Sequence, residues 1–444
     1  MLYQLSYLPT LQVIESGRLR SRSEDSTGNG QQDTKSQHEC RGLSRLVRKY
    51  DLGYGGSDCT APRNPLRRVK QTSYAGVGVD SSRAASSLKG LTALLRETFA
   101  FRKGIGRVML PFGYFANVID LGANLGLAIS TDGVGSKVLV AQLLGKFDTI
   151  GIDCIAMNVN DLLCVGAEPL ALVDYVAVQS PNRRFLREMG RGLYEGARQA
   201  RITIPGGEIA QLREIIRGVH KEDGFDLVGT CVGIVPLDRI IIGQRLKPKN
   251  VVLGLRSSGI HSNGLTLARD VLFRRHKLRP DRHLPELGRT LGAELLEPTR
   301  IYVPAIIDML KSGLDLKALH HITGDGLFNL TRVAAPVGFV IESWPEPQPL
   351  FGLLQAMGRI STAEMFRVFN MGIGFCIVLP DDRRQIDRAM AIARKHGVAC
   401  YRLGYTIRDP ERKIFLTPYG LVGHRNRFVS SARFRVPGSR KSRS

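Results

Sequence analysis

The stretch STDGVGSK at residues 130–137 follows an apolar run, residues 125–129, that predicts a β-strand. Asp132 ends this strand, and the glycines after it leave the backbone free to turn tightly and to approach a ligand. Lys137 lies on the first turn of the helix predicted to follow. A carboxylate, bare backbone amides and a lysine in such a short segment suit a metal-chelated polyphosphate.

A second informative stretch, MNVNDLLCVGAEP at residues 157–169, belongs to a helical pattern that covers residues 149–165. At about 100° per residue, Asp153, Asn160 and Asp161 fall within roughly one quadrant of this helix. Such side chains are costly to bury unless they are paired or bound to a cation. The helix can therefore carry a buried polar network or part of a Mg-nucleotide site, and the neighbouring glycine loop favours the Mg-nucleotide site.

Two further segments carry polar groups at the ends of predicted strands. Glu208 follows two glycines at the end of a short strand, residues 202–204, from which a carboxylate can reach a metal. The loop SSGIHSNG at residues 257–264 opens a helix predicted for residues 265–275. Small residues, a histidine and a helix N-terminus form a seat for an anion, although a plain capping turn has the same pattern.

The rhythm of strands and helices predicts an α/β (α+β) protein with two halves of similar size. We predict a disordered extension at residues 1–70, an N-terminal domain at residues 71–240, a C-terminal domain at residues 250–408 and a basic tail at residues 409–444. Residues 235–250 contain two prolines, a glycine and several charges, which is typical of an interdomain linker.

Composition limits the classes of partner. The chain has 63 basic and 40 acidic residues in 444, a net charge of +23. In the middle of the chain this excess is diluted and suits a phosphorylated small-molecule substrate, so we do not expect nucleic acid as a main ligand. Seven cysteines without a Cys-x-x-Cys pair indicate reduced thiols and a cytoplasmic location. No apolar run approaches the roughly 20 residues of a membrane span.

The two stretches resemble those of the phosphoribosylformylglycinamidine cyclo-ligase, or aminoimidazole ribonucleotide synthetase, family. DGVGSK at residues 132–137 is similar to the nucleotide loop of that family, and the MNVND and GAEP segments are similar to its acidic helix. SSGIHSNG at residues 257–264 and EMFRVFNMGIG at residues 364–374 extend the resemblance, which covers about three quarters of the chain and neither end.

The resemblance implies a fold and a reaction. It implies a four-stranded N-terminal sheet that pairs with its copy in a homodimer to close a barrel, and a second α/β domain. It also implies an ATP-dependent ligase of de novo purine biosynthesis. That enzyme closes the ring of 5′-phosphoribosyl-formylglycinamidine to give 5-aminoimidazole ribonucleotide, and it releases ADP and phosphate.

The resemblance also implies ATP and Mg²⁺ as cofactors and assigns roles to residues. The implied catalytic residues are Asp132, Lys137 and His261. The implied nucleotide-binding residues are Gly133, Gly135, Lys137, Asp161 and Asn263. The implied metal ligands are Asp132, Asp161, Asp153 and Glu208.

Three departures from the family pattern leave alternatives open. Ile209 stands where the family has a threonine, Asp325 stands where it often has a glycine, and residues 104–116 match its glycine loop loosely. A degenerate nucleotide-binding regulator is one alternative. Thiamine-monophosphate kinase, selenophosphate synthetase and the hydrogenase maturation factor have related acidic sites, but the HSNG, PTRIY and FNMGIG segments favour the cyclo-ligase.

Overall fold

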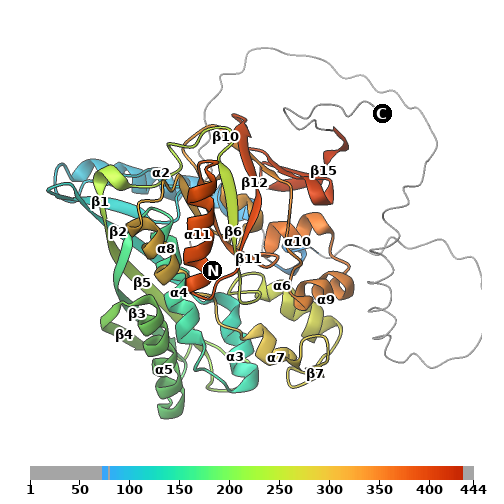
Figure 1. Ribbon diagram of the computed structural model, residues 1–444. Helices are drawn as coiled ribbons and strands as arrows, with labels where there is room; N and C mark the ends of the chain where they lie inside the picture. Colours follow the sequence, from blue (N-terminus) through green and yellow to red (C-terminus); the bar gives the residue numbers. More distant parts are fainter. Residues whose placement is uncertain (1–72, 79–80, 434–444) are drawn as a thin grey trace, which may run out of the picture. The chain divides into compact units, whose positions relative to one another are not determined.

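The computed structural model of the protein describes residues 73–78 and 81–433 (Figure 1). The predicted extension at residues 1–70 and the last eleven residues of the chain lie outside this described part. Two sheets, each with its own helices, follow one another along the sequence, as the α/β prediction requires. Within the described residues, every helix is too short or too polar to span a membrane.

The N-terminal half is built on a five-stranded sheet with the order β1-β2-β5-β3-β4, in which only β3 and β4 run parallel. Its strands are β1 (Asn117–Gly122), β2 (Leu125–Gly133), β3 (Glu168–Val178), β4 (Thr203–Gln211) and β5 (Phe225–Pro236). The prediction of four strands omitted β1, which forms a hairpin with β2. Its turn is made by Ala123 and Asn124, which both have positive φ. A short strand with a charge and a glycine shows too little apolar alternation to be recognised in the sequence.

Helices cover one face of this sheet. They are α3 (Val138–Leu144), α4 (Ile150–Leu163) and α5 (Arg183–Ala200), preceded in the chain by α2 (Ser81–Glu97). Helix α4 packs on β2 and β5, and α5 packs on α4. The two helices touch backbone to backbone, because a Cβ on Gly151 would lie 2.1 Å from the Leu193 nitrogen. This close packing holds the acidic helix α4 firmly against the end of β2.

The C-terminal half is built on an eight-stranded sheet with the order β15-β14-β13-β10-β12-β6-β11-β9. Its strands are β6 (Val251–Arg256), β9 (Ala318–His321), β10 (Val337–Ile341), β11 (Ile373–Leu379), β12 (Cys400–Arg408), β13 (Ile414–Leu416), β14 (Leu421–His424) and β15 (Arg427–Ser430). A separate pair is formed by β7 (His283–Leu284) and β8 (Arg289–Thr290). Strand β11, which lies between β6 and the edge strand β9, is buried along its whole length and belongs to the core of this half.

Helices α8 and α11 lie beside each other in this half, and α8 also contacts α4 and α5 of the other half (Figure 1). The α-helices are α6 (Leu265–Arg269), α7 (Leu291–Leu295), α8 (Val303–Lys311), α9 (Pro349–Gly358), α10 (Thr362–Val368) and α11 (Arg383–Lys395). The helix predicted for residues 265–275 is present as α6, continued by the π-helical η5 (Asp270–Arg275). The 3₁₀ helices are η1 (Ala75–Val77), η2 (Thr98–Phe101), η3 (Gly135–Lys137), η4 (Leu237–Arg239), η6 (Gly326–Thr331), η7 (Thr417–Tyr419) and η8 (Ser431–Arg433).

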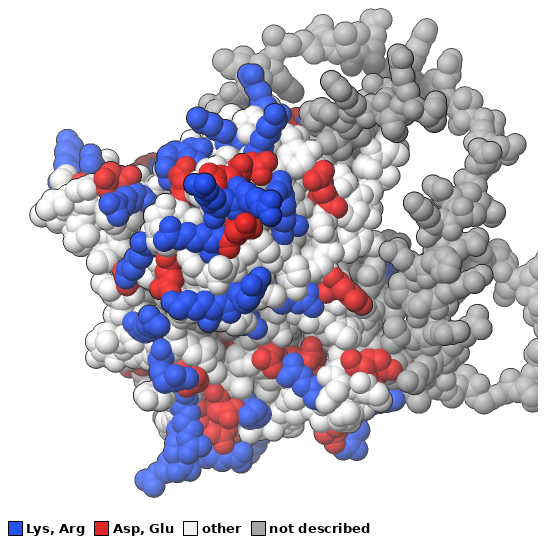
Figure 2. Space-filling model, viewed as in Figure 1, with Lys and Arg blue, Asp and Glu red and all other residues white. Residues whose placement is uncertain are grey.

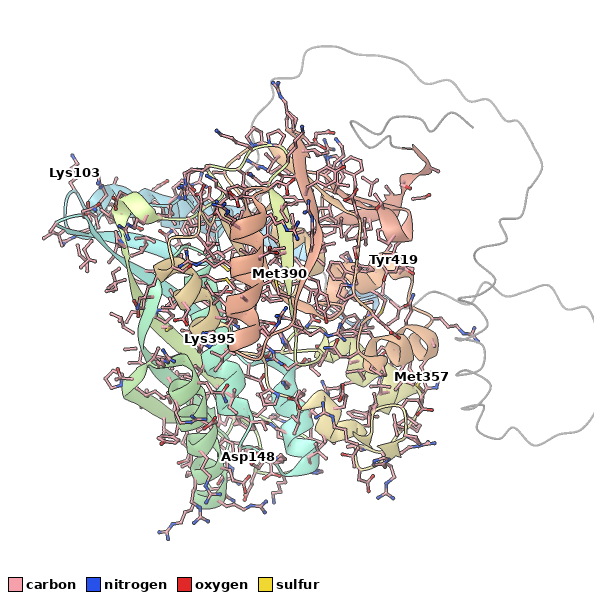
Figure 3. All side chains as sticks on the ribbon, viewed as in Figure 1. Lys103, Asp148, Met357, Met390, Lys395 and Tyr419 are labelled. Carbon is pink, nitrogen blue, oxygen red and sulfur yellow. The ribbon has the colours of Figure 1, made fainter. Side chains whose placement is uncertain are left out.

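The predicted basic tail at residues 409–444 is wrong for most of its described part. Strands β13, β14 and β15 extend the C-terminal sheet, with β13 parallel to β10. Phe415 and Val422 join Val340 in a buried apolar cluster. Tyr419 lies over Phe366 of α10, with ring centroids 4.8 Å apart (Figure 3). The arginines and lysines around these apolar side chains dominated the composition of the segment and concealed its strands.

Candidate functional site

Asp132 lies at the end of β2, where the strand meets α4. Its side chain is 4% exposed, and Oδ1 accepts a hydrogen bond from the Gly133 amide at 2.8 Å. Oδ2 has no hydrogen-bond partner among the described residues. Asn158 of α4 donates from Nδ2 to the Asp132 carbonyl oxygen at 3.1 Å, which fixes the strand end against the helix.

Asp161, near the end of α4, is fully buried and lies close enough to Asp132 for the two charges to interact. His321 of β9 contacts it, with 2.8 Å between Nδ1 and Oδ1. Burial first, and then the Asp161 charge, raises the pKa of Asp132 well above its usual value. Burial also raises the pKa of Asp161, and the His321 contact opposes this shift. Both carboxylates are therefore unfavourably placed until a cation approaches them.

These two carboxylates fit Mg²⁺, because Mg²⁺ is usually held by one or two carboxylates together with substrate phosphates and water. The bare Oδ2 of Asp132 is an acceptor without a donor, as a metal ligand must be. Within the described part of the chain, no group of three or more His, Cys, Asp or Glu side chains could hold a metal ion by itself. A cation here would need the oxygens of a bound phosphate to complete its coordination.

Lys137 and Asp153 form a buried ion pair, which differs from the roles expected for them. Both side chains have no exposed surface, and Nζ of Lys137 lies 2.8 Å from Oδ1 of Asp153. The lysine also donates to the Glu297 carbonyl oxygen at 2.6 Å. Oδ1 of Asp153 further accepts from the amide and the hydroxyl of Thr299, each at 2.7 Å. In this arrangement Lys137 does not face a phosphate and Asp153 does not face a metal, because each neutralises the other.

The polar face of α4 consequently joins the two halves of the molecule. Asn160 donates from Nδ2 to the Arg300 carbonyl oxygen at 2.9 Å and accepts from the Tyr302 amide at 3.0 Å. Asp153 accepts hydrogen bonds from Thr299, so α4 holds both ends of the segment at residues 299–302 that leads into α8. Asp153 and Asn160 therefore form a buried polar network, which was one interpretation of this helix. Asp161 lies near enough to Asp132 for their charges to interact, and the Mg-nucleotide site stays a prediction.

Glu208 does not join this cluster. It lies on β4, which is separated from β2 by β5 and β3, or roughly 14 Å at about 4.8 Å per strand. Gly207, the residue before Glu208, lies in the same row of paired residues across the sheet as Asp132. Because successive residues of a strand point to opposite faces, the Glu208 side chain lies on the other face of the sheet from Asp132. Glu208 is exposed there, and the prediction that it shares a metal with Asp132 within one chain is wrong.

His261 lies in the loop between β6 and α6 and is 1% exposed. Its Nε2 accepts from the amides of Ser258 at 3.3 Å and Arg300 at 3.5 Å, which assigns the ring proton to Nδ1. That Nδ1 has no partner among the described residues. Burial, followed by the nearby His321 and Lys137, holds the pKa of His261 well below its usual value. The ring is therefore neutral and presents an unsatisfied N–H donor.

The remaining predicted residues lie on the loops around this cluster. Gly133 donates its amide to the Asp132 side chain, and Gly135 has a φ of +69°, with open space where a side chain would be. Asn263 is partly buried, and its Nδ2 has no partner within the described chain. Its Oδ1 lies against Gly324, because a Cβ placed on that glycine would be 3.1 Å away.

Two of the departures from the family pattern contact a common residue. Asp325 forms an ion pair with Arg332 at 3.0 Å, and both side chains are almost fully buried. The guanidinium of Arg332 lies over the ring of Phe115, 4.7 Å from its centroid. The loosely matching loop and the aspartate in place of a glycine therefore belong to one packed arrangement beside the site.

Sequence reasoning missed His321, which contacts Asp161, and Thr299, which contacts Asp153. His321 begins the segment HITGDG at residues 321–326 and Thr299 lies within EPTRIY at residues 297–302, but a histidine or threonine beside a turn gives no sign of its distant partner. His321 is 160 residues from Asp161 in the sequence, and Thr299 is 146 residues from Asp153.

Comparisons with known proteins agree with this arrangement. The AIR synthase related protein N-terminal domain family matches residues 113–235, and the corresponding C-terminal domain family matches residues 247–417. The phosphoribosylformylglycinamidine cyclo-ligase of Thermococcus kodakarensis is 46% identical over 338 residues, or 76% of this chain and 96% of that protein. The cyclo-ligase of Methanothermobacter thermautotrophicus is 46% identical over 320 residues, or 72% and 90%. Among solved structures, AaThiL complexed with AMPPCP and TMP has a TM-score of 0.51 at 13% identity, over 74% of this chain and 94% of that one, which is a likeness of fold alone.

Proposed function

Because the chain belongs to the phosphoribosylformylglycinamidine cyclo-ligase family, we propose that it closes the imidazole ring in purine biosynthesis. The reaction converts 5′-phosphoribosyl-formylglycinamidine and ATP to 5-aminoimidazole ribonucleotide, ADP and phosphate. Phosphoryl transfer turns an amide oxygen into a leaving group, and the amidine nitrogen then attacks the same carbon. Such chemistry depends mainly on positioning and on neutralising charge.

The observation that carries this proposal is a division of unsatisfied polar atoms between the two halves. Around the site, the N-terminal half has buried acceptors without donors, including Oδ2 of Asp132 and Oδ1 of Asn158. The loop of residues 257–264 and Arg300, both of the C-terminal half, add buried donors without acceptors, which are Nδ1 of His261, Nδ2 of Asn263 and Nε of Arg300. A metal-chelated polyphosphate supplies a cation for the first set and anionic oxygens for the second.

We assign the metal to the two facing carboxylates. Asp132 and Asp161 would hold Mg²⁺, which when bound neutralises phosphate charge during transfer. The backbone of Gly133 and Gly135 can approach the phosphates, since no side chains stand in the way. Lys137 and Asp153 act without contacting the nucleotide. Their ion pair, with the hydrogen bond from Thr299 to Asp153, keeps the two halves in register. They are positioning residues.

His261 is assigned to the reacting oxygen. A neutral imidazole whose Nε2 is already occupied by backbone amides can only donate from Nδ1. Such a donor stabilises an oxygen that gains negative charge during phosphoryl transfer. Asn263, with a free Nδ2 two residues later, would contact the substrate or a phosphate oxygen.

We propose a homodimer, and exposed apolar side chains on one face of the N-terminal sheet support it. Leu170, Val173 and Tyr175 of β3 are each more than 40% exposed, although they are large and apolar. Val173 and Tyr175 lie on the face opposite α4, the same face as Glu208. Burying this face against a second copy removes apolar surface from water and supports the expected closed barrel. A Val173→Asp variant that stays dimeric in sedimentation experiments would contradict this interface.

We also propose a phosphorylated small-molecule substrate and a cytoplasmic location. On the face shown in Figure 2, basic side chains are interleaved with acidic ones, which does not suit a nucleic-acid backbone. The cysteines of the described residues are all free thiols. All of them are buried except Cys400, which is partly exposed, and this suits a reducing compartment.

A product assay tests the proposed function. Purified protein is incubated with the formylglycinamidine ribonucleotide, ATP and Mg²⁺, and both ADP and aminoimidazole ribonucleotide are measured. We expect equal amounts of the two products and no ADP without the ribonucleotide. ATP binding without either product would favour the degenerate regulator, and ADP release with thiamine monophosphate would favour the kinase.

A further inference from the structure

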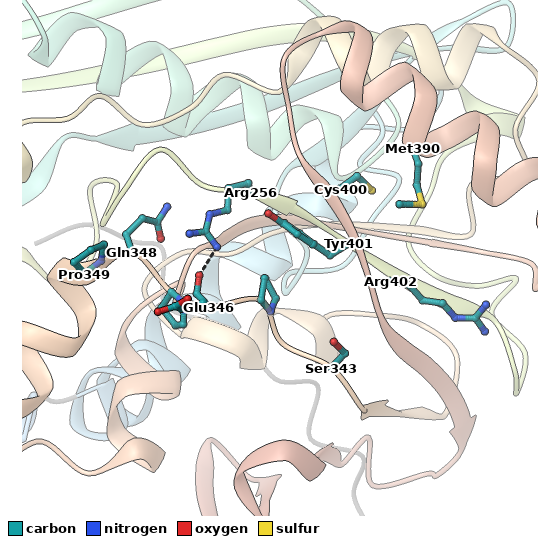
Figure 4. A pocket seen from close by; sticks show the side chains of 11 residues that line it. Arg256, Ser343, Glu346, Gln348, Pro349, Met390, Cys400, Tyr401 and Arg402 are labelled. Atoms are coloured by element: carbon teal, nitrogen blue, oxygen red, sulfur yellow. Dashed lines mark hydrogen bonds between the residues drawn. The ribbon is translucent and has the colours of Figure 1, made fainter. Parts of the chain in front are cut away.

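A cavity lies in the C-terminal half, and its lining contains none of the residues of the proposed site. It has a volume of about 840 Å³ and opens between the start of β12, helix α11 and the proline-rich segment at residues 343–349 (Figure 4). The volume falls within the roughly 300–1,000 Å³ of small-molecule sites.

The lining of this cavity combines positive charge with flat apolar surfaces. Arg256 and Arg402 lie on either side of the Tyr401 ring (Figure 4). Met390 of α11, labelled in Figure 3, and the three prolines of the segment at residues 345–349 add apolar surface. Glu346 is the only acidic residue in the lining, so the cationic side chains outnumber the anionic ones.

The two arginines are weakly engaged within the chain. Nη1 of Arg256 donates to the Glu346 carbonyl oxygen at 2.6 Å, which satisfies one of its five N–H groups with a neutral acceptor. Arg402 pairs with Asp381 at 3.3 Å, but both side chains are 53% exposed, and such surface pairs contribute little. A planar fork of this kind favours a phosphate or carboxylate, which it can bind at two oxygens.

The cavity is also connected to the His261 loop by hydrogen bonds. Gln348 lines the cavity, and its Nε2 donates to the Ser257 carbonyl oxygen at 2.9 Å. Ser257 donates from Oγ to Asn370 at 3.2 Å, and Asn370 donates in turn to the carbonyl oxygens of Gly259 and Ile260. The backbone of Arg256 leads directly into the same loop, and its carbonyl oxygen accepts from the Tyr302 hydroxyl at 3.0 Å. Movement of Arg256 or Gln348 would therefore displace the residues that position His261.

We propose that this cavity is a second ligand site for a planar ring that carries a phosphate, such as a nucleoside monophosphate. The ring lies against Tyr401 and the neighbouring apolar side chains, and the phosphate is held by Arg256, while Arg402 adds positive charge on the other side of the Tyr401 ring. Drawing Arg256 from the Glu346 carbonyl frees the proline-rich segment and shifts Gln348, so that occupancy changes turnover through the His261 loop. Binding stands independently of the proposed function, whereas the effect on turnover rests on it.

The chain contains a built-in reporter for binding. Trp344 is its only tryptophan, and it lies between Ser343 and Pro345, which both line the cavity. Its Nε1 donates to the Met371 carbonyl oxygen at 2.9 Å, beside the Asn370 connection. Its fluorescence should therefore respond to movement of the proline-rich segment.

The binding test titrates AMP into the full chain in EDTA, where metal-dependent binding at the Asp132 site is suppressed. We expect a saturable change in Trp344 emission, with affinity at least about tenfold weaker in Arg256→Ala and in Tyr401→Ala. Arg388→Ala removes an exposed arginine of α11 that does not line the cavity, and it should bind as the wild type does. Wild-type affinity in both cavity variants, or no saturable change confirmed by calorimetry, would overturn the site.

Two further experiments test the chemistry of the ligand and its effect on turnover separately. Adenosine and inorganic phosphate alone should each bind at least about tenfold more weakly than AMP, and equal binding of phosphate would refute the role of the ring. In the turnover assay at saturating MgATP, AMP should change kcat/KM at least twofold in the wild type and not in Tyr401→Ala. Binding of AMP without this difference would refute the coupling while leaving the site in place.

Discussion

Asp132 and Asp153 are both buried aspartates of the N-terminal half, but their surroundings differ. Oδ1 of Asp153 accepts hydrogen bonds from a buried lysine, from the amide and hydroxyl of Thr299 and from the Ser262 hydroxyl. Among the described residues, the Asp132 carboxylate accepts a hydrogen bond only from the amide of Gly133. The charge that most affects the pKa of Asp132 is another carboxylate, Asp161. The folded chain balances the charge of Asp153 by itself, whereas the Asp132 carboxylate has no cationic partner among the described residues.

This difference separates a residue that maintains the fold from one that binds a ligand. Burial and residue type are the same for both aspartates, so neither property makes the distinction. The charged partner makes the distinction, because a buried charge with a good partner is costly to disturb, while a buried charge without a partner is costly to retain. The predictions below use substitutions that should affect one aspartate through turnover and the other through stability.

Asp132→Asn should give the largest effect. Asparagine keeps the shape but weakens the charge that would hold Mg²⁺ on the phosphates, so turnover should fall by about 10³-fold or more. The melting temperature without ligand should stay the same or rise, because an uncompensated buried charge is removed. Steady-state kinetics at saturating ATP and Mg²⁺, with calorimetry of the same sample, would check both. Near-wild-type turnover would contradict the metal assignment.

Asp153→Asn should act mainly on stability. It leaves Lys137 buried without a counter-charge, which typically costs about 3–5 kcal/mol, or a drop in melting temperature of more than about 5 °C in a chain of this size. The matched control is Glu195→Gln, which breaks the exposed pair with Arg198 and should leave the melting temperature nearly unchanged. Thermal unfolding of the two variants measures the difference. If Asp153→Asn is as stable as the wild type and inactive, Asp153 belongs to the ligand site after all.

His261→Ala should reduce kcat by about 10²-fold, the scale of one lost electrostatic donor. His261→Asn is the informative partner, since asparagine tolerates the positive φ of 64° and can place an amide N–H near the position of Nδ1. We expect the Asn variant to recover most of the lost rate. Loss of stability in both variants, with normal turnover in the cold, would mean that the ring only packs beside Tyr302.

The smallest effect concerns pH. Since the pKa of Asp132 is raised in the folded protein, its contribution to stability is present below the unfolded pKa of about 3.9 and is lost as the pH rises through the folded pKa. Asp161 acts in the same direction. Stabilisation by MgATP should therefore increase with pH above about 4, and binding should release protons. Calorimetry in two buffers would count these protons, and an unchanged count in Asp132→Asn would contradict the assignment.

The sequence by itself determined the local elements around Asp132 and the family. The apolar run before Asp132 and its glycines predicted a strand and a tight loop, and helical spacing placed Asp153, Asn160 and Asp161 on one face of α4. The motifs also identified the family, and these predictions are confirmed. They succeeded because strand alternation, helix periodicity and glycine freedom act over a few residues.

Only the tertiary structure decided which polar groups meet. Lys137 pairs with Asp153, Asp161 pairs with His321, and Glu208 points to the other face of its sheet. The strands after residue 409 likewise form because β10 and its neighbours provide an edge to pair with. Each of these outcomes depends on residues far away in the chain. A buried carboxylate takes its role from the charge beside it, and that charge is brought there by folding.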